Sequence, residues 1–465
     1  MPVVLWTDAL VFLLLTAVVA FALFARRREH LRAPWRQVGR SGIAMASLVV
    51  LGVYVAIGLM DSMHFRPSLP SSSQTEPGSY STEVLSVFDR LVTHLRDMEE
   101  KTYSAPFATH LFVKETVEMP NGGAQRIYPR LVHGGRHLDN PRRDRIPDIL
   151  ATSLRAAMAG VALWIGLSAA FVALWARRHG RRFGAAGAGI LRGATATRWR
   201  PMLVTVGVCV ILICVVIALS FGYHVLGTDK VGEDVLYQTL KSVRTGLVIG
   251  TLTTLVMLPF AVGLGIMAGY FRGFVDDVIQ YLYTTLNSIP SVLLIAAAIL
   301  ILQVYLDGHA EDFTSVVERA DLRLLFLCLI LGVTSWTGLC RYLRAESWKL
   351  REVDYVQAAT ALGATHFAIL GRHILPNVMH IVLITVVLDF SGLVLAEAVL
   401  SYIQIGVDPT MHSWGNMINT ARLEMAREPV VWWSLSAAFL FMFTLVLAAN
   451  LFSDTVRDAL DPRLR

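Results

Sequence analysis

The chain has 465 residues, of which 55% are hydrophobic and 16% charged, and its formal net charge is +6. The apolar residues lie in long unbroken runs, which is the composition of an integral membrane protein and not of a soluble domain. The arginines gather in short loops beside these runs, so we do not expect nucleic-acid binding, and the four cysteines indicate no disulfide framework.

Nine apolar runs are long enough to cross a bilayer, whose core needs roughly 20 helical residues. Helices are the expected spanning form, because the backbone must satisfy its own hydrogen bonds in lipid. The fold class is therefore an all-α, polytopic transmembrane helical bundle. The first run is long for a signal peptide and its arginines follow it, so we interpret it as a mature helix. The expected spans are 3–25, 42–60, 149–176, 202–221, 246–268, 278–305, 322–343, 378–400 and 431–452.

The arginine distribution predicts which loops face the cytoplasm, because basic residues concentrate on that side. The basic loops 26–40 and 177–200 are placed inside, and the segment between them outside. Counting onward puts the loop 341–376 inside, the loop 401–429 outside, the amino terminus outside and the carboxyl terminus in the cytoplasm. Four parts result: two N-terminal transmembrane helices over 1–60, an external insert over 61–148, a third helix and basic cytoplasmic loop over 149–200, and a core over 201–465.

The external insert begins with a linker rich in proline and serine, 66–73. Apolar residues at helical spacing then predict one amphipathic helix over 81–100. We interpret the insert as a small external domain or as a cap packed over the spans, and the sequence assigns it no function.

The segment 351–376 carries the most informative pattern of the chain. Ala358 and Ala359 favour a helix, Gly363 permits a turn, and Pro376 is suited to begin the next helix just before a span. Two short helices joined at a glycine would form a compact knob. The stretches 355–363 and 373–377 together resemble the EAA loop of binding-protein-dependent ABC importer permeases. Taken alone, the pattern also fits an ordinary loop between two spans.

In the resembled family this knob sits in a groove of the ATPase subunit and carries its closure into the membrane. The resemblance therefore implies that the residues of ATPase coupling are Gln357, Ala358, Ala359, Gly363, Leu375 and Pro376. The sequence departs from the family pattern at Gln357, where Glu is usual, and at His373, where an aliphatic residue is common. Gln357 removes a charge that could pair with an ATPase arginine, but it can still accept a hydrogen bond.

Four further stretches resemble permeases of the dipeptide/oligopeptide (peptide/nickel) family and occur in that family's order: 224–235, 269–276, 288–291, and 400–407 with 413–417. In the first of them Glu233 replaces the usual Arg. The resemblance covers about 202–458 and implies a type I ABC importer permease core of about six spans in the C-terminal half. Residues 1–200 have no recognised counterpart.

The resemblance also implies a function, the movement of peptides through the bacterial inner membrane, with the insert 61–148 in the periplasm. The implied partners are a homologous second permease, two ABC ATPase subunits, a periplasmic solute-binding protein and membrane lipid. The chain has no GxxxxGK[ST] phosphate loop, so ATP and Mg would be bound by the ATPase subunits, and we expect neither a cofactor nor enzymatic activity on this chain.

The sequence leaves other substrates and other functions open. Nickel chelates, peptide antibiotics and oligosaccharides are alternative substrates. A channel or sensor would leave the coupling loop unexplained, and a membrane-embedded hydrolase would be expected to carry HExxH or GxSxG, which the sequence lacks.

Two acids, Asp389 and Glu397, lie inside the predicted span 378–400. Charged groups there cost several kcal/mol unless they face protein or water, so both are candidates for the translocation path. Asp389 would meet a peptide ammonium group, whereas Glu397 fits pairing within the permease interface equally well. Pro259 and Pro290 interrupt spans and are expected to kink them, either around a path or for ordinary packing.

The external loop 401–429 contains Pro409, Trp414, Gly415 and Asn416, which indicate a shaped surface element. Aromatic residues are enriched at protein contacts, so we expect these residues to dock the solute-binding protein, with Trp414 touching it.

We expect no metal site in the chain. The histidines at 366, 373 and 380 recur every seven residues, but Pro376 interrupts the helix that would align them. His133 and His137 are interpreted as polar surface residues.

Overall fold

The computed structural model describes residues 1–26, 29–68, 80–118, 124–309, 311, 313 and 315–460. Within them the chain is mostly helical, which confirms the predicted all-α class. Most of the linker predicted at 66–73 lies outside the described residues. The helices are α1 (Trp6–Arg26), α2 (Glu29–Val38), α3 (Gly42–Asp61), α4 (Val87–Leu91), α5 (Thr93–Arg96), α6 (Pro141–Arg178), α7 (Phe183–Leu191), α8 (Trp199–Ser220), α9 (Val235–Phe271), α10 (Gly273–Ser288), α11 (Ser291–Gly308), α12 (Val316–Ser335), α13 (Thr337–Arg351), α14 (Asp354–Ala361), α15 (His366–Ile369), the π-helix η2 (Leu370–Ile374), α16 (Leu375–Tyr402), α17 (Trp414–Glu424) and α18 (Trp433–Leu460). The strands are β1 (Pro2–Val3), β2 (His64–Phe65), β3 (Leu85–Ser86), β4 (Glu115–Glu118) and β5 (Ala124–Ile127).

Nine helices among the described residues are long and apolar enough to cross a membrane, and each overlaps one predicted span. Six of the nine begin at or after Trp199, which confirms the expected number of spans in the C-terminal half. Several are longer than predicted. The span expected at 246–268 belongs to the helix Val235–Phe271, and the span expected at 149–176 belongs to Pro141–Arg178.

The single span predicted at 278–305 is wrong. The structure has two helices there, α10 and α11, separated at Ile289 and Pro290. Ile289 is extended, with φ −92° and ψ 129°, because the proline ring disfavours a helical conformation in the residue before it. Pro259, in contrast, lies inside α9 without ending it.

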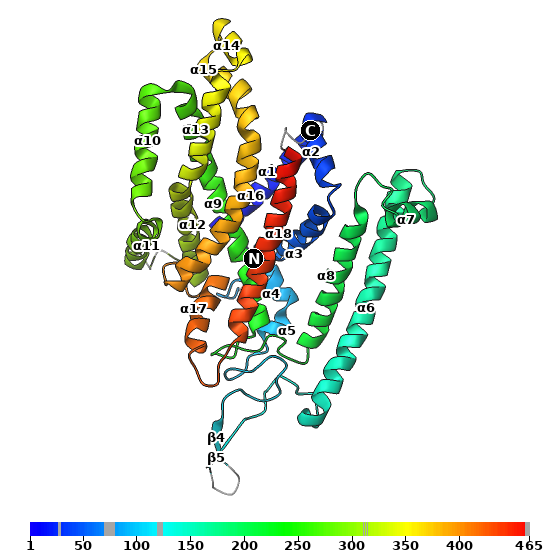
Figure 1. Cartoon of the computed structure of the whole chain (residues 1–465). Helices are drawn as coiled ribbons and strands as arrows, with labels where there is room; N and C mark the ends of the chain where they lie inside the picture. Colours follow the sequence, from blue (N-terminus) through cyan, green and yellow to red (C-terminus); the bar gives the residue numbers. More distant parts are fainter. Residues whose placement is uncertain are drawn as a thin grey trace, which may run out of the picture.

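Helix α9 is the centre of the bundle, and α3, α10, α12, α13 and α16 pack against it (Figure 1). Helices α6 and α8 pair with each other at one side and reach the bundle through the contact of α8 with α3. In Figure 1 the tip formed by α14 and α15, the helices α2 and α7 and the end of α18 lie toward one end of the molecule, and α17 and the β4–β5 hairpin lie toward the other.

The insert 61–148 contains little regular structure, and the amphipathic helix predicted at 81–100 is wrong. Ser86 and Asp89 form a capping box that starts α4 at Val87, and Val92 separates this short helix from α5. The insert packs onto the loop before α9: the Glu100 N–H donates to the Gly232 carbonyl at 3.0 Å, and the Thr228 N–H donates to the Ser104 carbonyl at 3.0 Å. These backbone bonds make the insert a cap on the core.

Candidate functional site

The knob is set by local backbone chemistry at the end of α14. Gly363 has φ +81°, a left-handed conformation that glycine adopts without penalty. Its N–H donates to the Thr360 carbonyl, and the N–H of Ala364 donates to the Ala359 carbonyl, both at 3.0 Å. This pair of bonds is a Schellman motif, which ends one helix and turns the chain toward the next. The predicted two helices joined at a glycine are therefore present in the structure.

The base of the knob is buried and its tip is exposed. Val356, Ile369 and Ile374 are buried in a cluster with side chains of α9 and α13. Leu362 and Phe367, on either side of the turn, are 88% and 83% exposed. Figure 1 shows this tip as an extreme point of the molecule. A buried base with two exposed apolar side chains at the tip is typical of an element that docks into another protein.

The predicted coupling residues divide between these two regions. Gln357, Ala358 and Gly363 are exposed near the tip, and the side-chain amide of Gln357 donates to the Glu352 carbonyl at 3.1 Å. Ala359 is half-buried and packs against the cluster at the base.

Leu375 and Pro376 lie in the connection to the next span. They begin α16, as expected for Pro376, but the helix continues without a gap from His366 to Tyr402. The π-helix η2 makes this possible: the Leu375 N–H bonds to the Leu370 carbonyl, five residues back, and the ladder shifts just before the proline, which has no N–H. The knob is thus continuous with a long membrane helix.

The two acids of α16 are not brought together, because eight residues of helix separate them by about 12 Å along its axis. Asp389 is half-buried, and among the described residues its carboxylate has no hydrogen-bond or ion-pair partner. Glu397 is 1% exposed and accepts a hydrogen bond from Ser401 Oγ at 2.7 Å. Its carboxylate also interacts with Ser413 and with the Gly415 backbone, so it holds the loop 401–429 against α16.

The expectation that Trp414 touches a partner protein is wrong. The indole is 1% exposed, its Nε1 donates to the Thr239 carbonyl at 3.1 Å, and the ring packs against Tyr54 and Gly246. A side chain enclosed in this way anchors α17 to α9 and cannot reach the surface.

The other three residues predicted to dock the solute-binding protein differ in exposure. Gly415 is also buried, and Asn416 is half-buried with its amide bonded to the carbonyls of Asp408 and Met411. Pro409 is exposed.

Comparison with known proteins identifies the family. Residues 261–465 match the model of the binding-protein-dependent transport system inner membrane component. The glutathione transport system permease GsiD of Pectobacterium atrosepticum is 31% identical over 244 residues, which are 52% of this chain and 73% of that protein. The chain belongs to this family of transport permeases.

Two more relatives of the permease are similar over the same half. The oligopeptide permease OppC of Haemophilus influenzae is 30% identical over 52% of this chain and 72% of its own length, and the dipeptide permease DppC of Lactococcus lactis is 29% identical over 52% and 64%. A solved inward-facing methionine transporter, MetNI, overlaps with a TM-score of 0.37 at 14% identity, covering 49% of this chain and 99% of that one, a value too low to establish a shared fold.

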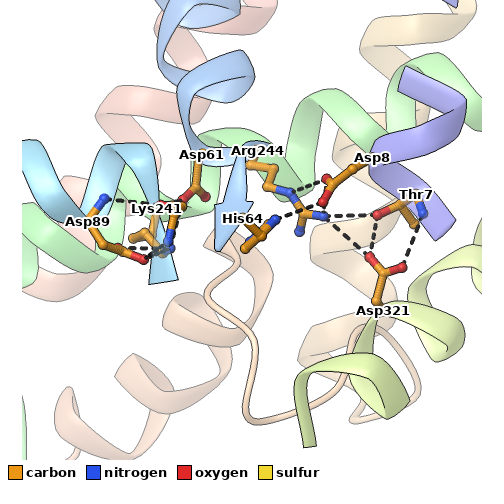
Figure 2. A network of polar contacts seen from close by, with 9 residues as sticks. Thr7, Asp8, Asp61, His64, Asp89, Lys241, Arg244 and Asp321 are labelled. Carbon is orange, nitrogen blue, oxygen red and sulfur yellow. Dashed lines mark hydrogen bonds and ion pairs between the residues drawn. The ribbon is translucent and has the colours of Figure 1, made fainter. Parts of the chain in front are cut away.

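The N-terminal helices of the permease are joined to its core by buried ion pairs (Figure 2). Arg244 of α9 donates to Asp8 of α1 at 2.6 Å and to Asp321 of α12 at 3.3 Å, and Asp321 in turn accepts from the Thr7 N–H at 3.1 Å. His64 Nδ1 lies 2.7 Å from the other oxygen of Asp8.

A second cation of α9 serves the same purpose. Lys241 Nζ lies 2.7 Å from Asp61 at the end of α3 and 3.1 Å from Asp89 of α4 (Figure 2). These two sets of ion pairs hold the N-terminal helices α1 and α3 and the insert helix α4 to one turn of α9.

Sequence reasoning missed these residues, although a signal was present. Asp8 lies inside the first predicted span, where an acid requires a partner. Lys241 and Arg244 lie just before the predicted span 246–268. Pairing an intramembrane acid with a cation at a span end would have suggested the contact.

Proposed function

We propose that this permease moves peptides inward and is driven by separate ATPase subunits that hold the segment 351–376. The relatives named for glutathione, oligopeptide and dipeptide transport support the substrate class. The observation that carries the coupling role is the knob, an exposed apolar tip on a buried base that continues into a membrane helix.

The proposed assembly contains this chain, a homologous second permease, two ABC ATPase subunits that bind ATP and Mg, and a periplasmic solute-binding protein. Closure of the ATPases on ATP would pull the knob and tilt α16, and hydrolysis would reset it. Asp389 is the proposed contact on the path, since its carboxylate is half-buried and would attract a peptide ammonium group.

The proposed orientation has the amino terminus in the periplasm and the carboxyl terminus in the cytoplasm. Two features support this orientation. The N-terminal ammonium donates to the Arg66 carbonyl of the insert at 2.9 Å, so the amino terminus lies beside the insert. In Figure 1 the knob, α2 and the carboxyl-terminal end of α18 lie toward the same end of the molecule.

The coupling role is tested by Phe367→Ala. Because this ring is 83% exposed, its removal should leave insertion and stability unchanged. If the tip docks into an ATPase, the variant should bring down less ATPase on co-purification and lose most peptide uptake. Phe274→Ala is the matched control, since Phe274 is 82% exposed but lies at the start of α10, outside the knob.

Gly363→Asp provides a second variant at the turn itself. No atom lies within 4 Å of a Cβ built at Gly363, so the cost comes from the left-handed backbone alone, about 1 kcal/mol. The variant should insert and pair with its sister permease, yet transport should collapse. Normal uptake with bound ATPases in both Phe367→Ala and Gly363→Asp would show that the knob is not the coupling element.

A further inference from the structure

An open pocket with a basic lining lies between the β4–β5 hairpin of the insert and the first turns of α6. Its volume is about 680 Å³. Among the described residues that line it, none is an acid and four are cations: Lys114, Arg126, Arg142 and Arg145. Lys114 and Arg126 come from the hairpin, and the two other arginines come from α6. The pocket therefore brings together positive charges from two separate elements.

These four cations have no counter-ion within the part of the chain that the structure describes. None of their side chains forms an ion pair with a described carboxylate, and the Lys114 Nζ lies 5.4 Å from the centre of the Tyr128 ring. The neighbouring acids Glu115 and Asp148 are bonded to residues outside the pocket, and Asp144 in the first turn of α6 does not line it. An uncompensated cluster of this kind attracts an anion.

His110, which also lines the pocket, responds to this charge. Burial lowers the pKa of His110, and the nearby charges of Arg142, Arg130 and Arg145 lower it further. The arginines therefore act together on one region of the pocket, and a bound anion would relieve their mutual repulsion.

On the α6 side the pocket continues into an exposed apolar face of the helix. Ile146 lines the pocket and is 61% exposed, and Leu150 and Leu154 follow at intervals of four residues with 64% and 63% exposure. Residues four positions apart lie on the same face of a helix. Since α6 is one of the helices able to cross a membrane, this apolar stripe faces lipid chains. A molecule that fills both regions would need an anionic group and an apolar tail.

The depth of the pocket matches that of lipid headgroups. Ile149 packs against the cluster that contains Leu219, next to the last residue of α8, so the apolar parts of α6 and α8 end at the same level. Arg145 lies about 6 Å beyond Ile149 along α6, and Arg142 about 10 Å beyond it. The polar layer on each side of a bilayer is about 5–8 Å thick, and a long arginine side chain can bridge the remaining distance.

We propose that this pocket binds the phosphate group of an anionic phospholipid from the leaflet on the side of the insert. Guanidinium and ammonium groups donate charge-assisted hydrogen bonds to phosphate oxygens, and the acyl chains would lie along the stripe that begins at Ile146. The stripe favours a lipid over a free phosphate ion. The acid-free lining favours a headgroup with net negative charge over a zwitterionic one. The proposal does not depend on transport, because lipid binding is measured on the permease alone.

The test measures lipid binding to the full chain in an uncharged detergent by native mass spectrometry. The probes are dioleoyl phosphatidylglycerol, dioleoyl phosphatidylcholine and the water-soluble glycerol 3-phosphate. Wild type should bind phosphatidylglycerol more tightly than either of the others. Combining Arg142→Gln with Arg145→Gln should weaken phosphatidylglycerol binding about tenfold or more, because two of the four cations are lost. Since neither arginine side chain has an ion-pair partner among the described residues, the melting temperature in the same detergent should not change.

Two further variants make the result specific. Combining Arg136→Gln with Arg143→Gln removes the same two charges from exposed side chains nearby that do not line the pocket, and should bind like wild type. Leu150→Gln should weaken the binding of phosphatidylglycerol and leave that of glycerol 3-phosphate unchanged. Lipid bound at basic loops elsewhere is common to all variants and cancels in the comparison.

Three results would each overturn the proposal. The first is equal affinity of wild type for phosphatidylglycerol and phosphatidylcholine, and the second is an equal loss of phosphatidylglycerol binding in the two double variants. The third is glycerol 3-phosphate binding as tightly as phosphatidylglycerol, which would make the pocket a site for free phosphate compounds and not for lipid.

Discussion

The contact between the insert and the core should respond to pH through His224. This side chain has no exposed surface; its Nδ1 lies 2.7 Å from Asp234 and its Nε2 lies 3.5 Å from Glu100 of the insert. Burial alone would lower the pKa of His224, but the two carboxylates outweigh it and raise the pKa from 6.5 to about 9. The difference corresponds to about 3 kcal/mol of folding free energy.

Whether stability rises or falls with pH follows from the direction in which folding shifts the pKa of each group. Because the pKa of His224 is higher in the folded state, its contribution is complete below pH 6.5 and is lost as the pH rises to about 9. Burial tends to raise the pKa of Glu100, but the nearby His224 and hydrogen bonds from backbone N–H groups lower it from 4.5 to about 2, so the contribution of Glu100 is complete above pH 4.5 and constant over this range.

His224→Gln removes the titrating group and keeps a side-chain donor. The free energy of unfolding is measured by SDS titration with tryptophan fluorescence. The amount by which the wild-type value exceeds that of His224→Gln should be largest at pH 6. This advantage should shrink by about 3 kcal/mol by pH 9. The titration of Glu233 near pH 7 is present in both chains and cancels in the comparison. An advantage that stays constant from pH 6 to pH 9 would refute the assigned role of His224.

Two substitutions test the buried contacts of α9 with other elements. Trp414→Ala should lower the free energy of unfolding by about 3–5 kcal/mol because it leaves a cavity. It should also reduce basal and carrier-stimulated ATP hydrolysis equally. Selective loss of the stimulated rate would instead indicate that Trp414 contributes to docking of the carrier. Arg244→Met should cost about 3–5 kcal/mol because Asp8 and Asp321 lose their buried partner, whereas Arg319→Met, which breaks an exposed pair, should cost less than about 1 kcal/mol in the same denaturation assay.

The features that the sequence predicted well are those decided by neighbouring residues. The turn at Gly363 depends on a helix end and a glycine within a few positions, and the spans depend on runs of apolar residues. The sequence underestimates the length of α9 because a lysine such as Lys241 is typical of a loop beside a span. In the structure its charge is neutralised by Asp61 and Asp89, which lie far away in the chain. The burial of Trp414 likewise depends on Tyr54 from another helix.

The break at Pro290 shows a different limit. A proline in an apolar run can either kink a helix, as Pro259 does inside α9, or end it. The choice depends on whether neighbouring helices satisfy the freed backbone groups, which hydropathy does not report.

The ion pair between Asp8 and Arg244 also sets an order for biogenesis. The two residues are 236 positions apart, and at roughly 5–20 residues per second the ribosome needs on the order of 10–50 s to make the second after the first. Throughout this interval α1 carries an acid whose permanent partner has not yet been synthesised, and Asp321 completes the group later still. The group of ion pairs that holds α1 can therefore be complete only after Asp321 has been synthesised, so α1 is made long before it gains all of its buried partners.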